Sequence, residues 1–445
     1  MSNLFYMIWE KIFGRANSKN EPDIRFGRYS DAYKSDEQYA AWDKAVAAFE
    51  KQQYVESYQA FFDYLRDEGE DNVSYVVEDG VIHFSVIQGS KEIKGTASNE
   101  RVVCETDIAT YDRLIVAVMR KLVEINYGLH YSRFAIHDKT ICLKFDTSVL
   151  DGSPEKLYFA LKEVATQADK QDDLLVSEFS SLKLMGNDHV VELPIEEKKN
   201  KYAFLQKWIK DAFLRIESLD ANKHTASIAY TLLSLTYRID YLLAPEGSLM
   251  DRLEKIHKEY FGNLEDSPVR KNEKIQKIFR DILSEEEDLI LRDLYRIKST
   301  FGITAPTAPI QIATLINNEI TSINAYLESK QDNIAVSILE YIAQYSMFYY
   351  GIPQATRALF HLLIRTIHSD YFTALGYSEV YYNADTNTFN TKAIRKKINA
   401  INKDAIGRFP HFKVYTNQLK YTSLVDFLVS LLRQIQQLKY DRQPL

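Results

Sequence analysis

The stretch VSYVVEDGVIHFSVIQGSKEIKGTAS, residues 73–98, interrupts a chain whose other segments mostly have helical periodicity. Ile82, Phe84 and Val86 alternate with other side chains, which is typical of a strand with one buried face. The sequences EDG (78–80) and QGS (88–90) supply the turns that antiparallel strands need. We therefore expect consecutive strands here, the third over residues 91–97 or in its continuation over residues 101–105.

A second β region lies at HYSRFAIHDKTICLKFDTSV, residues 130–149. It predicts two strands in which Phe134 and Ile136 face Ile141, Leu143 and Phe145 across the HDK turn. Helical periodicity precedes the first β region over residues 36–69, as one helix or as two joined near residues 51–53, and it separates the two β regions from about residue 108 to residue 122. Two further helices are expected, the first capped by Ser153 with Pro154 at its first position and the second extending to residue 182. An antiparallel sheet needs cover on at least one face, so the first fold prediction is an α+β domain with about five strands.

The strand signal ends near residue 194. Nine amphipathic or apolar segments follow, and they predict an all-helical domain. The expected segments are residues 200–219, 223–243, 249–261, 270–300, 309–329, 331–350, 353–374, 391–403 and 421–439. PHFKVYT, residues 410–416, is a further candidate for extended structure. The predicted organisation is an N-terminal extension (1–34), an α+β domain (35–193) and a helical domain (194–445).

Composition narrows the class of protein. The 445 residues include 46% hydrophobic and 26% charged side chains, which favours folded domains over disorder. The net charge of −7 gives no global attraction to nucleic acid or anionic lipid. Two cysteines make no disulfide framework, which favours the cytoplasm. The apolar segment 4–13 is too short to span a bilayer, so we expect no membrane span. We leave open whether it is a short amphipathic helix on the protein itself, at a membrane interface or on a partner.

Glycine and histidine spacing excludes several kinds of site. The closest glycines, Gly89 and Gly95, are six residues apart, so GxGxxG, GxxxxGK[ST] and GxSxG motifs are absent. No two histidines are closer than seven residues, which excludes HExxH. We therefore predict no catalytic residues, no cofactor and no metal site.

Two weaker clusters keep alternatives open. His361 and His368 lie two helical turns apart with Arg365 between them, and such a set can hold a ligand or an anion. Buried histidines satisfied by their neighbours give the same pattern. The segment 392–420 carries eight basic side chains and one acid, with Phe409, Phe412 and Tyr415 interleaved. Arg395, Lys396 and Lys397 are its candidate contacts for an anionic partner, although a solvated helix face has the same composition.

The sequence from about residue 35 to residue 184 resembles the type III secretion chaperone fold and its YbjN-like relatives. LIVAVMRKLVEIN, which ends at Asn126, is followed by the hairpin of residues 133–148 and by a helix that opens at Pro154. The helix, three-strand, helix, two-strand, helix order is shared as well. The resemblance implies protein binding through strand residues, which here are Val77, Phe84, Phe134 and Leu143. The helical domain and the N-terminal extension depart from the family pattern.

These observations favour a non-enzymatic protein-binding, chaperone-like or assembly module with a protein or peptide partner, and they leave a homodimer open. The first alternative is a ligand-binding protein or enzyme with a site near His361, Arg365 and His368. The second is an anionic-partner binder acting through residues 392–420, although the composition does not favour nucleic acid as the partner.

Overall fold

The computed structural model describes residues 21–440 except 68, 186–188 and 303. The chain forms two compact units. The sheet unit contains residues 29–192 and 295–303, and the helical unit contains residues up to 28, residues 193–294 and residues from 304 onward. The α+β fold class is confirmed. Residues 4–13, for which an interfacial contact was left open, lie outside the described residues.

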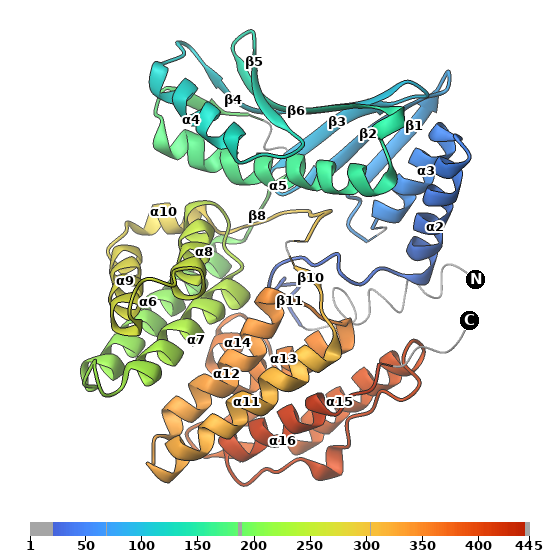
Figure 1. Cartoon of the computed structure of the whole chain (residues 1–445). Helices are drawn as coiled ribbons and strands as arrows, with labels where there is room; N and C mark the ends of the chain where they lie inside the picture. Colours follow the sequence, from blue (N-terminus) through green and yellow to red (C-terminus); the bar gives the residue numbers. More distant parts are fainter. Residues whose placement is uncertain (1–20, 68, 186–188, 303, 441–445) are drawn as a thin grey trace. The chain divides into compact units, whose positions relative to one another are not determined.

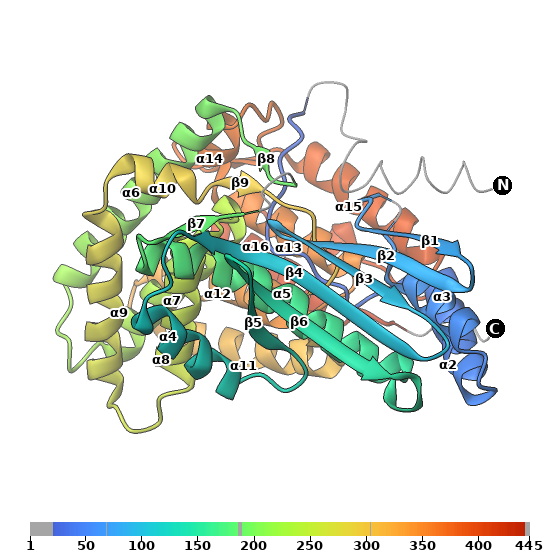
Figure 2. The same ribbon diagram turned by 90° about the horizontal axis from the view of Figure 1, so that it is seen from above.

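The sheet unit is built on an antiparallel sheet in the order β1-β2-β3-β4-β6-β5, with β7 paired to β4 (Figure 2). The expected alternation is present, because Ile82, Phe84 and Val86 are all buried. Phe134 pairs with Leu143 and Ile136 with Ile141, as the sequence predicts. The strands are β1 (Val73–Glu78), β2 (Val81–Gln88), β3 (Lys91–Ala97), β4 (Arg101–Tyr111), β5 (Arg133–His137), β6 (Thr140–Ser148) and β7 (Leu182–Leu184).

The two faces of the sheet differ in chemistry. The inner face carries the apolar side chains that pack with α3 (Tyr54–Leu65), α4 (Val116–Tyr127) and α5 (Pro154–Glu178) into one core (Figure 1). The outer face carries ion pairs between strands, such as Glu105 with Lys144 at 2.6 Å and Asp146 with Arg133 at 2.6 Å. Alternation along each strand therefore separates the core from a charged surface.

Capping side chains and a proline mark the first residues of two helices in the sheet unit. Ser35 and Gln38 form a capping box at the start of α2 (Asp36–Glu50). The side chain of Ser153 accepts a hydrogen bond from the backbone of Lys156, and Pro154 occupies the first turn of α5. Of the two alternatives for the helical segment over residues 36–69, one helix or two joined near residues 51–53, the structure has the second, with α2 and α3 separated at residues 51–53.

Three sequence predictions in the sheet unit are wrong. The sheet has seven strands instead of about five. Residues 108–111 belong to β4, and the following helix begins only at Val116, because these residues pair with β6 and β7. The two helices expected after Ser153 are the single helix α5, and Leu182 lies in β7. Apolar residues at helical and strand spacing are hard to separate when the strand is buried on one face and paired on both sides.

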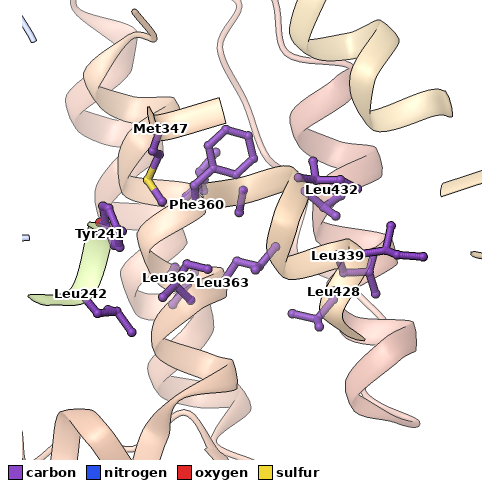
Figure 3. Close-up of a cluster of buried hydrophobic side chains, with 14 of the residues drawn as sticks. Tyr241, Leu242, Leu339, Met347, Phe360, Leu362, Leu363, Leu428 and Leu432 are labelled. Atoms are coloured by element: carbon purple, nitrogen blue, oxygen red, sulfur yellow. The ribbon is translucent and has the colours of Figure 1, made fainter. Parts of the chain in front are cut away.

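The helical unit contains α6 to α16, more helices than the nine or so predicted. Its core joins α7, α12, α13 and α16, and Figure 3 shows Leu339, Leu363 and Leu432 within it. The helices are α6 (Ile195–Glu217), α7 (Thr225–Leu243), α8 (Gly247–Phe261), α9 (Pro268–Leu283), α10 (Glu287–Arg292), α11 (Pro309–Glu328), α12 (Asp332–Tyr349), α13 (Gln354–Ile367), α14 (Ser369–Ala374), α15 (Thr391–Ile406) and α16 (Leu424–Gln436).

Short paired strands complete the two units. In the sheet unit β8 (Val191–Glu192) pairs with β9 (Tyr295–Arg296). In the helical unit β10 (Ala305–Pro306) pairs with β11 (Tyr350–Gly351), and β12 (Tyr382–Asn383) pairs with β13 (Thr388–Phe389). The short 3-10 helices are η1 (Val149–Asp151) and η2 (Thr416–Gln418). No helix among the described residues is long and apolar enough to cross a membrane.

The predicted domain boundaries need a correction at residues 295–303. The sequence predicted that residues 270–300 form one helix of the helical domain, but α9 ends at Leu283, residues 295–296 form β9, and residues 295–303 belong to the sheet unit. Thr300 and Phe301 donate backbone hydrogen bonds to the side chain of Gln88, and Phe301 joins the core of the sheet unit. The predicted extension is also divided, since its described residues 21–28 join the helical unit and residues 29–34 join the sheet unit. Residues 410–416 form no strand.

Candidate functional site

Helix α4 is fixed to the sheet by its inner face and by its C-terminal end. Val118 and Leu122 are buried in the core of the sheet unit. The side chain of Asn126 accepts a hydrogen bond from the backbone N–H of Phe134 (2.6 Å) and donates one to its carbonyl oxygen (3.2 Å). These two bonds satisfy backbone groups of the edge strand β5, which would otherwise be open to pairing. The orientation of α4 is therefore determined.

The opposite face of α4 is apolar and exposed. Val116 is 57% exposed, Met119 39%, Val123 69% and Tyr127 95%. Their spacing of three and four residues places them in one stripe along the helix, opposite Val118 and Leu122. An amphipathic helix on a protein surface needs only one apolar face. A second apolar face that stays exposed is typical of an interaction surface. We call these four residues the α4 stripe.

Charged side chains flank the α4 stripe. Arg120 and Glu124 are exposed on the same helix, four residues apart. Lys121 lies 3.6 Å from Glu178 of α5, so it is directed toward the sheet unit's own surface. Lys121 also lies 4.0 Å from Glu124. Arg120 and Glu124 are thus the exposed charges beside the stripe.

The four strand residues expected to contact a partner do not form a surface. Phe84 and Phe134 are nearly inaccessible to solvent, and Leu143 is fully buried. Phe84 packs against Phe62 of α3 with ring centroids 4.5 Å apart. These residues lie on the inner face of the sheet, where the unit's own helices cover them. Of the four, only Val77 near the end of β1 is exposed.

His361 and His368 do not share a site. The ring nitrogen Nδ1 of His361 lies 2.8 Å from the hydroxyl of Tyr241. Burial and the nearby positive charges of Arg365 and Lys397 lower the pKa of His361 to about 3, so its ring is neutral. Arg365 is buried and pairs instead with Glu21 at 2.7 Å. The side chains of His361, Arg365 and His368 do not converge on one site, because each contacts a different neighbouring segment.

His368 belongs to a buried network centred on Glu340 of α12. Arg238 of α7 forms two hydrogen bonds with the Glu340 carboxylate (2.7 and 2.6 Å), and Nε2 of His368 lies 2.6 Å from it. Gln344 and Ser234 donate to the same carboxylate. Burial alone would raise the pKa of Glu340, but Arg238 and His368 together hold it below its usual range. Both oxygens of the Glu340 carboxylate thus have hydrogen-bond partners, which indicates a structural role for this carboxylate.

The basic segment is divided between surface and core. Arg395 and Lys396 are exposed on α15, whereas Lys397 is half-buried. Burial, together with the charge of Arg365, lowers the pKa of Lys397. Phe409 and Phe412 are core residues of the helical unit, so only Tyr415 of the three interleaved aromatic residues is exposed. Stacking of bases on these phenylalanines is excluded in this conformation.

A second buried polar cluster lies at the turn between β2 and β3. The backbone N–H of Ser90 donates to Asp169 (2.9 Å) and its hydroxyl donates to Asp172. Lys91, almost fully buried, pairs with Asp172 at 3.1 Å. Gly89 has φ = +60°, and a Cβ there would lie 1.6 Å from the Asp169 carboxylate. Burial beside Asp172 raises the pKa of Asp169, and the cluster ties the turn to α5.

Among the described residues, no group of three or more His, Cys, Asp or Glu side chains could hold a metal ion. No family model matches the chain, and no curated protein sequence matches it either. The α4 stripe is therefore identified from geometry alone. The sequence contained a signal for it, because VAVMRKLVEINY has apolar residues on two opposite sides of a helix. That signal was missed because the sequence analysis followed a single apolar period through residues 108–122, which left out Val116, Val123 and Tyr127.

Proposed function

We propose that the chain is a non-enzymatic protein-binding module and that the α4 stripe is its binding surface. The observation that carries the proposal is the exposure of Val116, Met119, Val123 and Tyr127 on a helix whose other face is already anchored. Apolar side chains at this spacing fit the groove or the face of another helix. Burial of each such side chain stabilises a complex by about 1.5–3 kcal/mol before the entropy losses of association.

The arrangement of the α4 stripe favours a second copy of the chain as the partner. In an antiparallel pair of α4 helices about a two-fold axis, Val116 faces the partner's Tyr127 and Met119 faces the partner's Val123. The same axis brings Arg120 opposite the partner's Glu124, which joins opposite charges at the rim. An isologous interface requires such self-complementarity.

The test is the mass of the full chain in solution, measured by light scattering during size-exclusion chromatography. We expect twice the chain mass of 51.6 kDa for the wild type and the monomer mass for Val123→Asp. Leu150→Asp is the matched control, because Leu150 is 85% exposed in the same unit but lies outside the stripe. A monomeric wild type, or a dimer that Val123→Asp leaves intact, contradicts the proposal.

Charge reversal separates the rim contact from general loss of apolar surface. Arg120→Glu places two acids opposite each other and should weaken the dimer at least tenfold. Arg120→Glu combined with Glu124→Arg restores the opposite charges and should recover most of the loss. Equal affinities for the single and the double variant would show that the two helices do not pack in this register.

A second candidate function rests on the exposed basic face of α15. Lys392, Arg395, Lys396 and Lys403 are exposed, and their spacing places them on one side of the helix, which can bind the phosphates or sulfates of an anionic partner. The test is retention on heparin, which should fall with salt and with the variant Lys396→Glu/Lys403→Glu. Lys277→Glu, at an exposed lysine of α9, is the control. Unchanged retention of the double variant would refute this function.

A further inference from the structure

Residues 21–28 have no regular secondary structure and belong to the helical unit. They precede the sheet unit in the chain, yet their contacts include α7, α8, α12, α13 and α14. The helical unit surrounds each of Phe26, Gly27 and Arg28 with groups that suit its side chain or, for Gly27, its lack of one. Together these contacts have the character of a peptide in a groove.

Arg28 fills an acidic pocket. Its guanidinium donates to Asp240 of α7 (2.7 Å) and to Glu254 of α8 (2.9 Å), and its Cζ lies 5.1 Å from the centre of the Phe348 ring. Asp240 is buried, and burial raises its pKa although Arg28 opposes the shift. Two carboxylates beside one aromatic ring need a planar cation, so the pocket selects arginine.

Gly27 is required by its surroundings. Its backbone N–H donates to the carbonyl oxygen of Tyr241 at 2.8 Å. Its φ is +70°, and a Cβ would lie 2.7 Å from the Tyr241 ring. A side chain at this position is therefore opposed both by the backbone conformation and by the ring.

Phe26 enters an aromatic pocket. Its ring centre lies 5.1 Å from that of Phe372, 5.3 Å from that of His361 and 6.3 Å from that of Tyr241. The neutral His361 ring suits this apolar environment. Five residues earlier, Glu21 pairs with the buried Arg365. The residues expected to form a ligand site, His361 and Arg365, thus lie beside the chain's own N-terminal segment.

The same triplet occurs a second time in the chain. Phe13, Gly14 and Arg15 repeat Phe26, Gly27 and Arg28 thirteen residues earlier, and they lie outside the described residues. We propose that the helical unit has a peptide-binding groove for the sequence Phe-Gly-Arg, and that residues 13–15 are a second ligand that exchanges with residues 26–28.

The exchange has a defined consequence for the chain. Both triplets have the same three residues for binding, while the contact of Glu21 with Arg365 favours residues 26–28. A ligand that is covalently linked to its binding site by a short segment can reach effective concentrations on the order of millimolar, so residues 13–15 can compete even with a modest intrinsic affinity. When they occupy the groove, the connection to the sheet unit becomes thirteen residues longer.

The first test uses a fluorescent peptide with the sequence of residues 21–28, EPDIRFGR, and full-length variants. The wild type should not bind it, because its groove is filled in cis. Phe26→Ala/Arg28→Ala should bind weakly, because residues 13–15 take over the groove. Adding Phe13→Ala/Arg15→Ala should tighten binding at least tenfold.

The control peptide EPDIRFAR should bind the fourfold variant at least tenfold more weakly, because its alanine meets the Tyr241 ring. Equal binding by the double and the fourfold variant would overturn the role of residues 13–15. A folded fourfold variant that binds neither peptide would overturn the groove itself.

A cross-linking measurement keeps the proposal testable if the fourfold variant does not fold. Ala16→Cys and Lys258→Cys are introduced into the Arg28→Ala chain, since Lys258 is exposed one turn beyond Glu254 on α8. The native Cys104 and Cys142 are buried. A short bismaleimide should join positions 16 and 258 within one chain at least fivefold more than positions 16 and 328, with Glu328→Cys as the control. Equal yields would overturn the exchange.

Discussion

The prediction with the largest expected effect concerns Glu340, the acceptor at the centre of the buried network. Glu340→Gln keeps the shape of the side chain and removes its charge, so Arg238 is left buried without a counter-charge. Breaking one partner of a buried ion pair costs about 3–5 kcal/mol. The carboxylate also accepts hydrogen bonds from Ser234 and Gln344, which an amide can accept only in part.

The expected loss in the free energy of unfolding of the helical unit is therefore about 3–5 kcal/mol. For a unit of this size each kcal/mol lowers the melting temperature by about 2–4 °C, so a decrease of roughly 10 °C is expected. Trp208 is the local probe, because its ring lies 5.6 Å from Cζ of Arg238 and 5.7 Å from the His368 ring. Urea unfolding is followed by its fluorescence in a Trp9→Phe/Trp42→Phe background.

Two further variants test whether the unpaired buried charge causes the loss of stability. Glu328→Gln changes an exposed glutamate of α11 and should stay within about 0.5 kcal/mol of the wild type. Arg238→Met/Glu340→Leu removes both charges and should be less destabilised than Glu340→Leu alone, because no unpaired charge remains. A Glu340→Gln variant as stable as Glu328→Gln would refute the assignment of this network as a structural anchor.

Three other predictions concern stability. Gly89→Ala should destabilise the sheet unit by at least about 2 kcal/mol in urea unfolding, because its Cβ meets Asp169, and Asp169→Ala should recover part of the loss. Because the pKa of Asp169 is raised in the folded state, its stabilising contribution is largest at low pH and is lost as the pH rises. Asp169→Asn should therefore be more stable than the wild type at pH 8. The stabilities of the two proteins should differ less at pH 4. His361 has a lowered pKa of about 3, so its contribution to the free energy of unfolding is complete above about pH 6.5 and decreases as the pH falls. Lowering the pH to 5 should reduce the free energy of unfolding by about 2 kcal/mol. His361→Gln should reduce that dependence in thermal melts, and an unchanged pH profile would contradict it.

Much of the local structure could be predicted because its causes are local. The alternation of Ile82, Phe84 and Val86 requires a strand with one inner face wherever it packs. Ser153 and Pro154 mark a helix start because a side-chain oxygen and a missing N–H satisfy the first turn without outside help. The absence of closely spaced glycines likewise follows directly from the sequence.

The candidate sites were less predictable because they depend on which neighbour covers which residue. Phe84 and Phe134 have the chemistry of a binding surface, but the unit's own helices bury them. His361 and His368 are two turns apart on the sequence, yet one faces Phe26 and the other Glu340. Lys91 follows a turn, where a lysine side chain is usually exposed, but its ion pair with the Asp172 carboxylate holds it in the interior.

The sequence by itself determined the α+β class, the order of most elements and the exclusion of several catalytic motifs, because periodicity and spacing act through neighbouring residues. Only the tertiary structure decided that Val116, Met119, Val123 and Tyr127 are left outside the core. It also decided that residues 295–303 join the sheet unit and that Arg28 enters an acidic pocket between α7 and α8. These outcomes depend on contacts between residues far apart in the chain, which local patterns do not encode.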